Sequence, residues 1–210
     1  MNARAVNARV VNARAANARA VSTRARDNPF RAARIEGLRY RAPGFRWPDL
    51  TARLASQGGR GAIRGAQGSG KTTLLHELGD RLAAAGWEVR RLRPDLDDRR
   101  LVGEQVHALT RGAGKRTALL LDGADRLGLL RWSLFLRAAQ AAGVLVVTTH
   151  REGRLPTLHR CRTTPRLLAE LVAELRPAGL PEVSLEALFR RQRGNLRAAL
   201  RSLYDAQAAR

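Results

Sequence analysis

Eight consecutive residues in the first half of the chain have the spacing of a phosphate-binding loop. Gly65, Gly70, Lys71 and Thr72 occupy every fixed position of the pattern G-x-x-x-x-G-K-[ST]. Glycines let successive backbone N–H groups turn inward around phosphate oxygens, and the helix that follows directs the positive end of its dipole at them. The residues predicted to contact a bound nucleotide are Gly65, Ala66, Gln67, Gly68, Ser69, Gly70, Lys71, Thr72 and Thr73.

The lysine of this pattern is unusual for the chain. Lys71 and Lys115 are the two lysines among 39 basic residues, so a chance lysine at the required position is improbable. A Lys71 ammonium group would bridge the β- and γ-phosphates, and the Thr72 hydroxyl would bind Mg²⁺. The alternative is a flexible glycine-rich turn without a ligand.

Two carboxylates are the further candidates for chemistry. Asp122 ends the apolar run 117–121, and an acid at the tip of a buried parallel strand faces the crevice where ligands of open α/β sheets bind. Asp122 is therefore predicted to hold Mg²⁺ through water. Asp125 is the nearby acid on its C-terminal side, and it is the candidate for polarising an attacking water. Each acid has an alternative role as an ordinary helix cap.

The pattern of apolar residues predicts the elements that must position these groups. A short strand at 62–63 enters the loop, and a helix beginning at Thr72 leaves it. Continuous apolar runs predict the buried strands 117–122 and 143–150. The other predicted elements are strands at 87–93 and 157–162 and helices at 95–109 and 126–142. This alternation predicts an α/β fold with a five-stranded, mainly parallel sheet.

This order of elements resembles the additional-strand division of P-loop NTPases, especially the AAA+ ATPases and the related STAND and NACHT groups. The sequence Asp122-Gly123-Ala124-Asp125 looks like the D-G-x-D form of NACHT-type proteins. The resemblance implies a three-layer P-loop NTPase fold in which the fourth strand lies beside the P-loop strand and its tip senses the γ-phosphate. Thr148, Thr149 or His150 would be that sensor, with Thr149 or His150 best placed; Thr149 is the catalytic candidate.

The C-terminal segment carries the second part of the resemblance. Residues 165–210 contain three helix patterns and no strand pattern, which is similar to the small helical lid of AAA+ proteins. The tract Gly194-Asn195-Leu196-Arg197 looks like the sensor 2 motif G-[ND]-x-R of that lid. The resemblance therefore implies ATP and Mg²⁺ as cofactors and Arg197 as a γ-phosphate contact. With 37 arginines in the chain, an arginine at this position without that role is the alternative.

The composition divides the chain into four parts. Residues 1–27 repeat the unit NARAV with small changes and carry no amphipathic face, which predicts a disordered low-complexity tail. Residues 28–60 are predicted as a linker, 61–164 as the ATPase core and 165–210 as the helical lid. Four aromatics interleave with arginines in 28–47. They are predicted to pack on the following domain, and stacking on nucleobases is the alternative.

Net charge and cysteine content indicate which partners and which redox environment suit the chain. The net charge of +21 favours nucleic acid as a partner, unless the arginines reflect a GC-rich genome. A protein partner or a homo-oligomer is a further hypothesis. A single cysteine, Cys161, excludes an internal disulfide and favours a reducing cytoplasm. No apolar run approaches the roughly 20 residues of a membrane span.

The leading functional hypothesis is an ATP-binding, Mg²⁺-dependent ATPase that couples the nucleotide to a conformational change, with slow turnover if Asp125 is badly placed. A small-molecule or nucleotide kinase is the first alternative, although no acceptor-binding insertion interrupts the predicted strands. The second alternative is a nucleic-acid-associated nucleotide switch with little hydrolysis. A GTPase is disfavoured because the chain lacks an N-K-x-D motif.

Overall fold

The computed structural model describes residues 28–94, 99–175 and 184–209. The predicted low-complexity tail, 1–27, lies outside them. The strands are β1 (Arg60–Gly65), β2 (Glu88–Leu92), β3 (Thr117–Leu121), β4 (Val144–Thr149) and β5 (Thr157–Cys161). The helices are α2 (Ala32–Glu36), α3 (Trp47–Ser56), α4 (Lys71–Ala84), α5 (Arg99–Thr110), α6 (Leu129–Ala138), α7 (Pro165–Leu175), α8 (Leu185–Arg191) and α9 (Leu196–Ala208), with a 3₁₀ turn η1 (Ala124–Arg126).

The five strands form one sheet in the order β2-β3-β4-β1-β5. Every pairing among these strands is parallel, which is stricter than the mainly parallel sheet predicted. The connections explain this, because helices return the chain to the same end of the sheet between β1 and β4. The fourth strand lies between β1 and β3, beside the strand that enters the glycine-rich loop.

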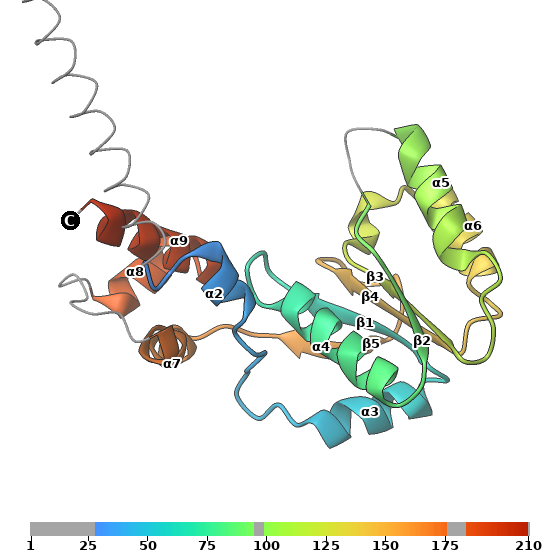
Figure 1. The fold of residues 1–210 in the computed structure, drawn as a ribbon, viewed down its shortest axis with the longest axis horizontal. Helices are drawn as coiled ribbons and strands as arrows, with labels where there is room; N and C mark the ends of the chain where they lie inside the picture. Colours follow the sequence, from blue (N-terminus) through green and yellow to red (C-terminus); the bar gives the residue numbers. More distant parts are fainter. Residues whose placement is uncertain (1–27, 95–98, 176–183, 210) are drawn as a thin grey trace, which may run out of the picture.

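Helices cover both faces of the sheet and make three layers (Figure 1). Alternate strand residues point to opposite faces. Ala118 and Leu120 of β3 therefore join the apolar cluster under α3 and α4. Leu119 and Leu121 join the cluster under α5 and α6. Because both faces are buried, β3 and β4 contain the continuous apolar runs 118–121 and 144–147, as the sequence predicted.

A separate group of helices lies at one end of the sheet (Figure 1). The apolar sides of α7, α8 and α9 share one buried cluster, to which Phe30 and Leu38 also belong. The Asn28 side-chain amide donates to the Tyr204 carbonyl at 3.0 Å. The segment 28–60 therefore begins in the C-terminal helical group and ends in α3 beside the sheet. No helix in the described ranges has the length and apolar content to cross a membrane.

Two helices differ from their predicted bounds. The helix predicted at 126–142 is observed as the shorter α6: the chain forms η1, breaks at Leu127, and begins α6 at Leu129 after Gly128. Leu127 and Gly128 have extended backbone, which separates η1 from α6. The helix predicted at 95–109 is observed as α5 from Arg99, and residues 95–98 lie outside the described ranges.

Candidate functional site

The glycine-rich loop joins β1 to α4 at the carboxyl end of the sheet. Gly68 and Gly70 have φ angles of 70° and 88°, which favour glycine. Gly65 is required for space, because a Cβ there would lie 2.5 Å from the Ser69 Oγ and 2.8 Å from the Cys161 carbonyl oxygen. The residues of the predicted pattern thus form a tight turn whose exit is the N-terminus of a 14-residue helix.

Lys71 is the first residue of α4, and its side chain folds back over the loop. Its Nζ donates to the carbonyl oxygens of Gly65 at 2.9 Å and Ala66 at 2.8 Å. Burial lowers the pKa of Lys71, and the acidic groups of Cys161, Asp122 and Asp125 oppose this shift. The ammonium group is therefore held where a phosphate cradled by the loop would replace the two carbonyls as its partner.

Thr72 and Asp122 are in direct contact, although Thr72 lies on α4 and Asp122 follows β3. The Thr72 hydroxyl donates to Asp122 Oδ2 at 3.0 Å. The other carboxylate oxygen accepts from the Thr148 hydroxyl at 2.7 Å, and Thr148 in turn accepts from the Gly123 amide at 2.8 Å. A hydroxyl and a carboxylate are hard oxygen donors of the kind Mg²⁺ prefers. The donor set therefore fits the predicted metal.

Asp125 and the tip of β4 form a second connected pair. The Asp125 carboxylate accepts from the Thr149 hydroxyl at 2.7 Å and from the His150 amide at 2.6 Å. Partial burial raises the pKa of Asp125, but these two hydrogen bonds, together with the charges of His150 and Arg154, hold the pKa below that of an ordinary aspartate. Asp125 is therefore ionised at neutral pH. It does not cap α6, whose N-cap is Gly128.

The first turn of α9 packs on the tip of the loop. A Cβ at Gly68 would lie 1.8 Å from Asn195 Oδ1 and 3.3 Å from the Arg197 backbone nitrogen. Asn195 caps α9 by accepting from the Ala198 amide at 3.0 Å. The neighbouring Gly194 carbonyl accepts from the Thr163 hydroxyl at 2.9 Å. The exposed Arg197 thus belongs to a turn in direct contact with the loop.

The segment that precedes α3 packs against the opposite side of the loop. The Tyr40 ring lies next to Gly70, where a Cβ would be 3.2 Å from two ring carbons. The Tyr40 hydroxyl lies 2.8 Å from His159 Nε2, and its backbone N–H donates to Glu77 of α4. Burial, with the charge of Arg53, lowers the pKa of His159. These contacts support the predicted packing role of the early aromatics.

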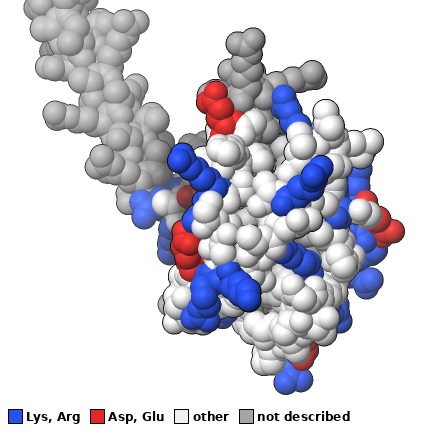
Figure 2. All heavy atoms as spheres, turned by 90° about the vertical axis from the view of Figure 1, so that its right-hand side faces the viewer, with Lys and Arg blue, Asp and Glu red and all other residues white. Residues whose placement is uncertain are grey.

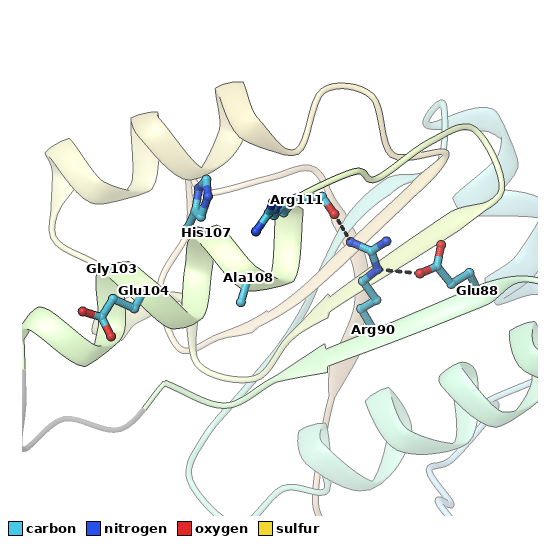
Figure 3. A pocket seen from close by; sticks show the side chains of 7 residues that line it. All are labelled: Glu88, Arg90, Gly103, Glu104, His107, Ala108 and Arg111. Atoms are coloured by element: carbon cyan, nitrogen blue, oxygen red, sulfur yellow. Dashed lines mark hydrogen bonds and ion pairs between the residues drawn. The ribbon is translucent and has the colours of Figure 1, made fainter.

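Two hollows differ in their relation to the loop. One of about 330 Å³ includes no loop residue in its lining, which consists of Arg41, Ala42, Pro43, Thr164, Arg166, Leu167 and Glu170. A larger one of about 610 Å³ lies between α5 and the sheet-edge strand β2. In Figure 3 the Arg90 guanidinium reaches from β2 to Glu88 and to the Arg111 carbonyl. Glu88 is the first residue of β2, so the larger hollow lies at the opposite end of the strands from the loop.

Two side chains near the predicted metal position were not assigned to that position from the sequence. Thr148, considered as one of three sensor candidates, binds Asp122, whereas Thr149 binds Asp125. Strand alternation could have distinguished them, since consecutive residues of β4 face opposite sides of the sheet. Arg93 follows β2, and its Nε lies 3.8 Å from Asp122 Oδ2. Its position past the end of a strand was the available signal.

Comparison of the chain with protein-family models and with curated proteins found no match.

Proposed function

We propose that the chain is an ATP-binding, Mg²⁺-dependent ATPase of the AAA+/STAND type. The observation that carries the proposal is the meeting of three independent sequence elements at one end of a parallel sheet. Lys71 begins α4 after the loop that follows β1. Asp122 follows β3, with its Oδ2 3.0 Å from the Thr72 hydroxyl, and Thr149 at the end of β4 holds Asp125. A ligand in an open α/β sheet binds at this end of the strands.

Each residue has a role that follows from its contacts. Backbone amides of the loop and the N-terminus of α4 would bind the phosphates, with Lys71 moving from its two carbonyl partners to the β- and γ-phosphates. Thr72 and Asp122 would hold Mg²⁺, which supplies charge neutralisation on the phosphate oxygens.

Hydrolysis requires a group that orients water near the γ-phosphate. Asp125 is ionised and fixed by Thr149 and the His150 amide, so it offers an oriented carboxylate. Arg197, in the turn that contacts the loop, would neutralise charge in the transition state. Because α9 rests on the loop, a change in the phosphate bound there would move the C-terminal helices.

The test uses the chain's two lysines as a matched pair. A fluorescent ATP analogue with Mg²⁺ should bind the wild type, and Lys71→Ala should weaken binding by about 10- to 100-fold, the loss expected for one charge-assisted contact. Lys115→Ala, which removes an exposed lysine, should bind like the wild type. Equal affinities for the two variants would refute the proposed site.

Turnover is measured separately, as release of inorganic phosphate without an added acceptor, which distinguishes an ATPase from a kinase. Asp125→Asn should lower the release rate at least tenfold and leave the affinity for the ATP analogue within about twofold. An unchanged rate would remove Asp125 from the mechanism without removing the binding site. A parallel assay with DNA present tests the predicted nucleic-acid partner.

A further inference from the structure

Helix α6 places three large apolar side chains in solvent. The exposed fractions of Leu129, Leu130 and Leu134 are 81%, 75% and 56%. Among the residues that the structure describes, these are the large hydrophobic side chains that stand exposed, and all three belong to one ten-residue helix. Isolated exposed leucines are ordinary, but an exposed apolar cluster marks an interaction surface.

The cluster cannot be hidden by a rotation of the helix. The opposite side of α6 carries Trp132 and Phe135, which are buried in the cluster beneath the sheet. The Arg154 guanidinium stacks on the Trp132 ring at 5.0 Å and fixes it further. Leu130, Leu134 and the exposed Ala138 are spaced by four residues and form one ridge along the outer side. A ridge of this kind fits a groove of a second helix.

The charge around the ridge selects the partner. Helix α6 contains Arg131 and Arg137 and no acidic residue. Neither arginine has an ion pair within the described part of the chain. Figure 2 shows the side of the molecule on which α5 and α6 lie, where blue side chains and some red ones stand around a mostly white surface. An acidic partner would therefore be steered to this face and oriented on it.

The composition of the other possible occupants of this surface disfavours each of them. A second copy carries the same net charge of +21 and presents the same arginines, so the two copies would repel. The N-terminal segment 1–27 contains six arginines, one aspartate and no leucine or aromatic residue. Nucleic acid would match the arginines but would leave the leucines, which lie at the centre, without an apolar partner.

We propose that the outer side of α6 is the docking site for an acidic amphipathic helix of another protein, with leucine-type residues packed on the Leu130–Leu134–Ala138 ridge and carboxylates facing Arg131 and Arg137. The helix-in-groove mode uses this combination of apolar anchors and flanking charge. The site lies outside the nucleotide-binding residues, so it stands or fails independently of the proposed ATPase activity.

The probe is a fluorescein-labelled 21-residue peptide designed to form a helix with leucine on one side and glutamate and alanine elsewhere. Its binding to the full chain is measured by fluorescence anisotropy without nucleotide. The comparison peptide has the same composition in a scrambled order. We expect micromolar binding of the amphipathic peptide, and a Kd at least tenfold higher for the scrambled one and for L130Q/L134Q. Circular dichroism checks that this variant remains folded.

The arginines are tested with a charge-matched pair of double variants. R131Q/R137Q should raise the Kd at least threefold, whereas R191Q/R201Q, which removes two exposed arginines from α8 and α9, should leave it within twofold. Equal binding of the two peptides, or equal effects of the two double variants, would overturn the proposal. So would leucine-dependent self-association in sedimentation, or leucine-dependent binding to phosphatidylglycerol vesicles in place of the peptide.

Discussion

The two hydrogen bonds of the Thr148 hydroxyl allow a quantitative prediction about stability that does not depend on any ligand. Thr148 is buried on β4, donates to Asp122 at 2.7 Å and accepts from the Gly123 amide at 2.8 Å. Thr148→Val has nearly the same shape and removes both hydrogen bonds at once. Thr148→Ser keeps both and removes a single buried methyl group.

The magnitude follows from the two partners that are left behind. A lost hydrogen bond to a carboxylate costs about 1.5–3 kcal/mol, and a buried N–H without an acceptor costs about 1–3 kcal/mol. Burial of the new methyl group of valine stabilises the folded protein by about 0.8 kcal/mol. We therefore expect Thr148→Val to lower the free energy of unfolding by about 3 kcal/mol. For a protein of this size, that loss lowers Tm by about 6–12 °C.

The assay is urea unfolding followed by circular dichroism and tryptophan fluorescence, with differential scanning calorimetry for Tm. Thr148→Ser should cost about 1 kcal/mol, the amount for one buried methyl group. The reasoning fails if Thr148→Val stays within about 0.5 kcal/mol of the wild type. It also fails if the serine variant is as unstable as the valine variant, because the hydroxyl would then not be the cause.

Three further predictions concern the surroundings of the loop. Gly68→Ala should lower the free energy of unfolding, measured in urea, by about 2 kcal/mol. About 1 kcal/mol comes from the left-handed backbone and about 1 kcal/mol from displacing the Asn195 cap. Gly58→Ala is the control, because Gly58 has φ 62° and open space around it and should lose only the backbone contribution. Burial raises the pKa of Cys161 to about 11, so a thiol reagent at pH 8 should label the protein only after unfolding. Because the unfolded thiol loses its proton first, stability should fall as pH rises from 9 to 11, and Cys161→Ala should reduce that fall.

The sequence predicted the strands well because their signal is local. The continuous apolar runs that predict strands at 117–122 and 143–150 correspond to β3 and β4, which are buried on both faces. Ser184 and Asn195 cap α8 and α9 with their side chains, and a polar residue of this kind before a helix is a local signal for its start. The loop is likewise placed by its glycines and its single lysine.

What the sequence could not predict depends on contacts between distant residues. The start of the helix predicted from Arg126 was wrong, since α6 begins at Leu129. Asp125 is bound by residues 24 and 25 positions later, and no local pattern reports such a bond. The division of residues 28–60 between two clusters has the same origin, since Asn28 bonds Tyr204 across 176 positions. The pairing of Asp122 with Thr148 rather than Thr149 needed the register of the sheet.

The position of β1 in the sheet also governs the order in which the chain can fold. Both strands that pair with β1 come late in the sequence, since Ala62 lies beside Val147 of β4 and Thr157 of β5. A nascent chain that ends before Val144 can pair only β2 with β3, so the glycine-rich loop has no sheet to anchor it. Such distant pairings are slow to form and leave apolar strands exposed meanwhile. On the ribosome, the loop with the most conspicuous sequence acquires its shape only after most of the protein has been synthesised.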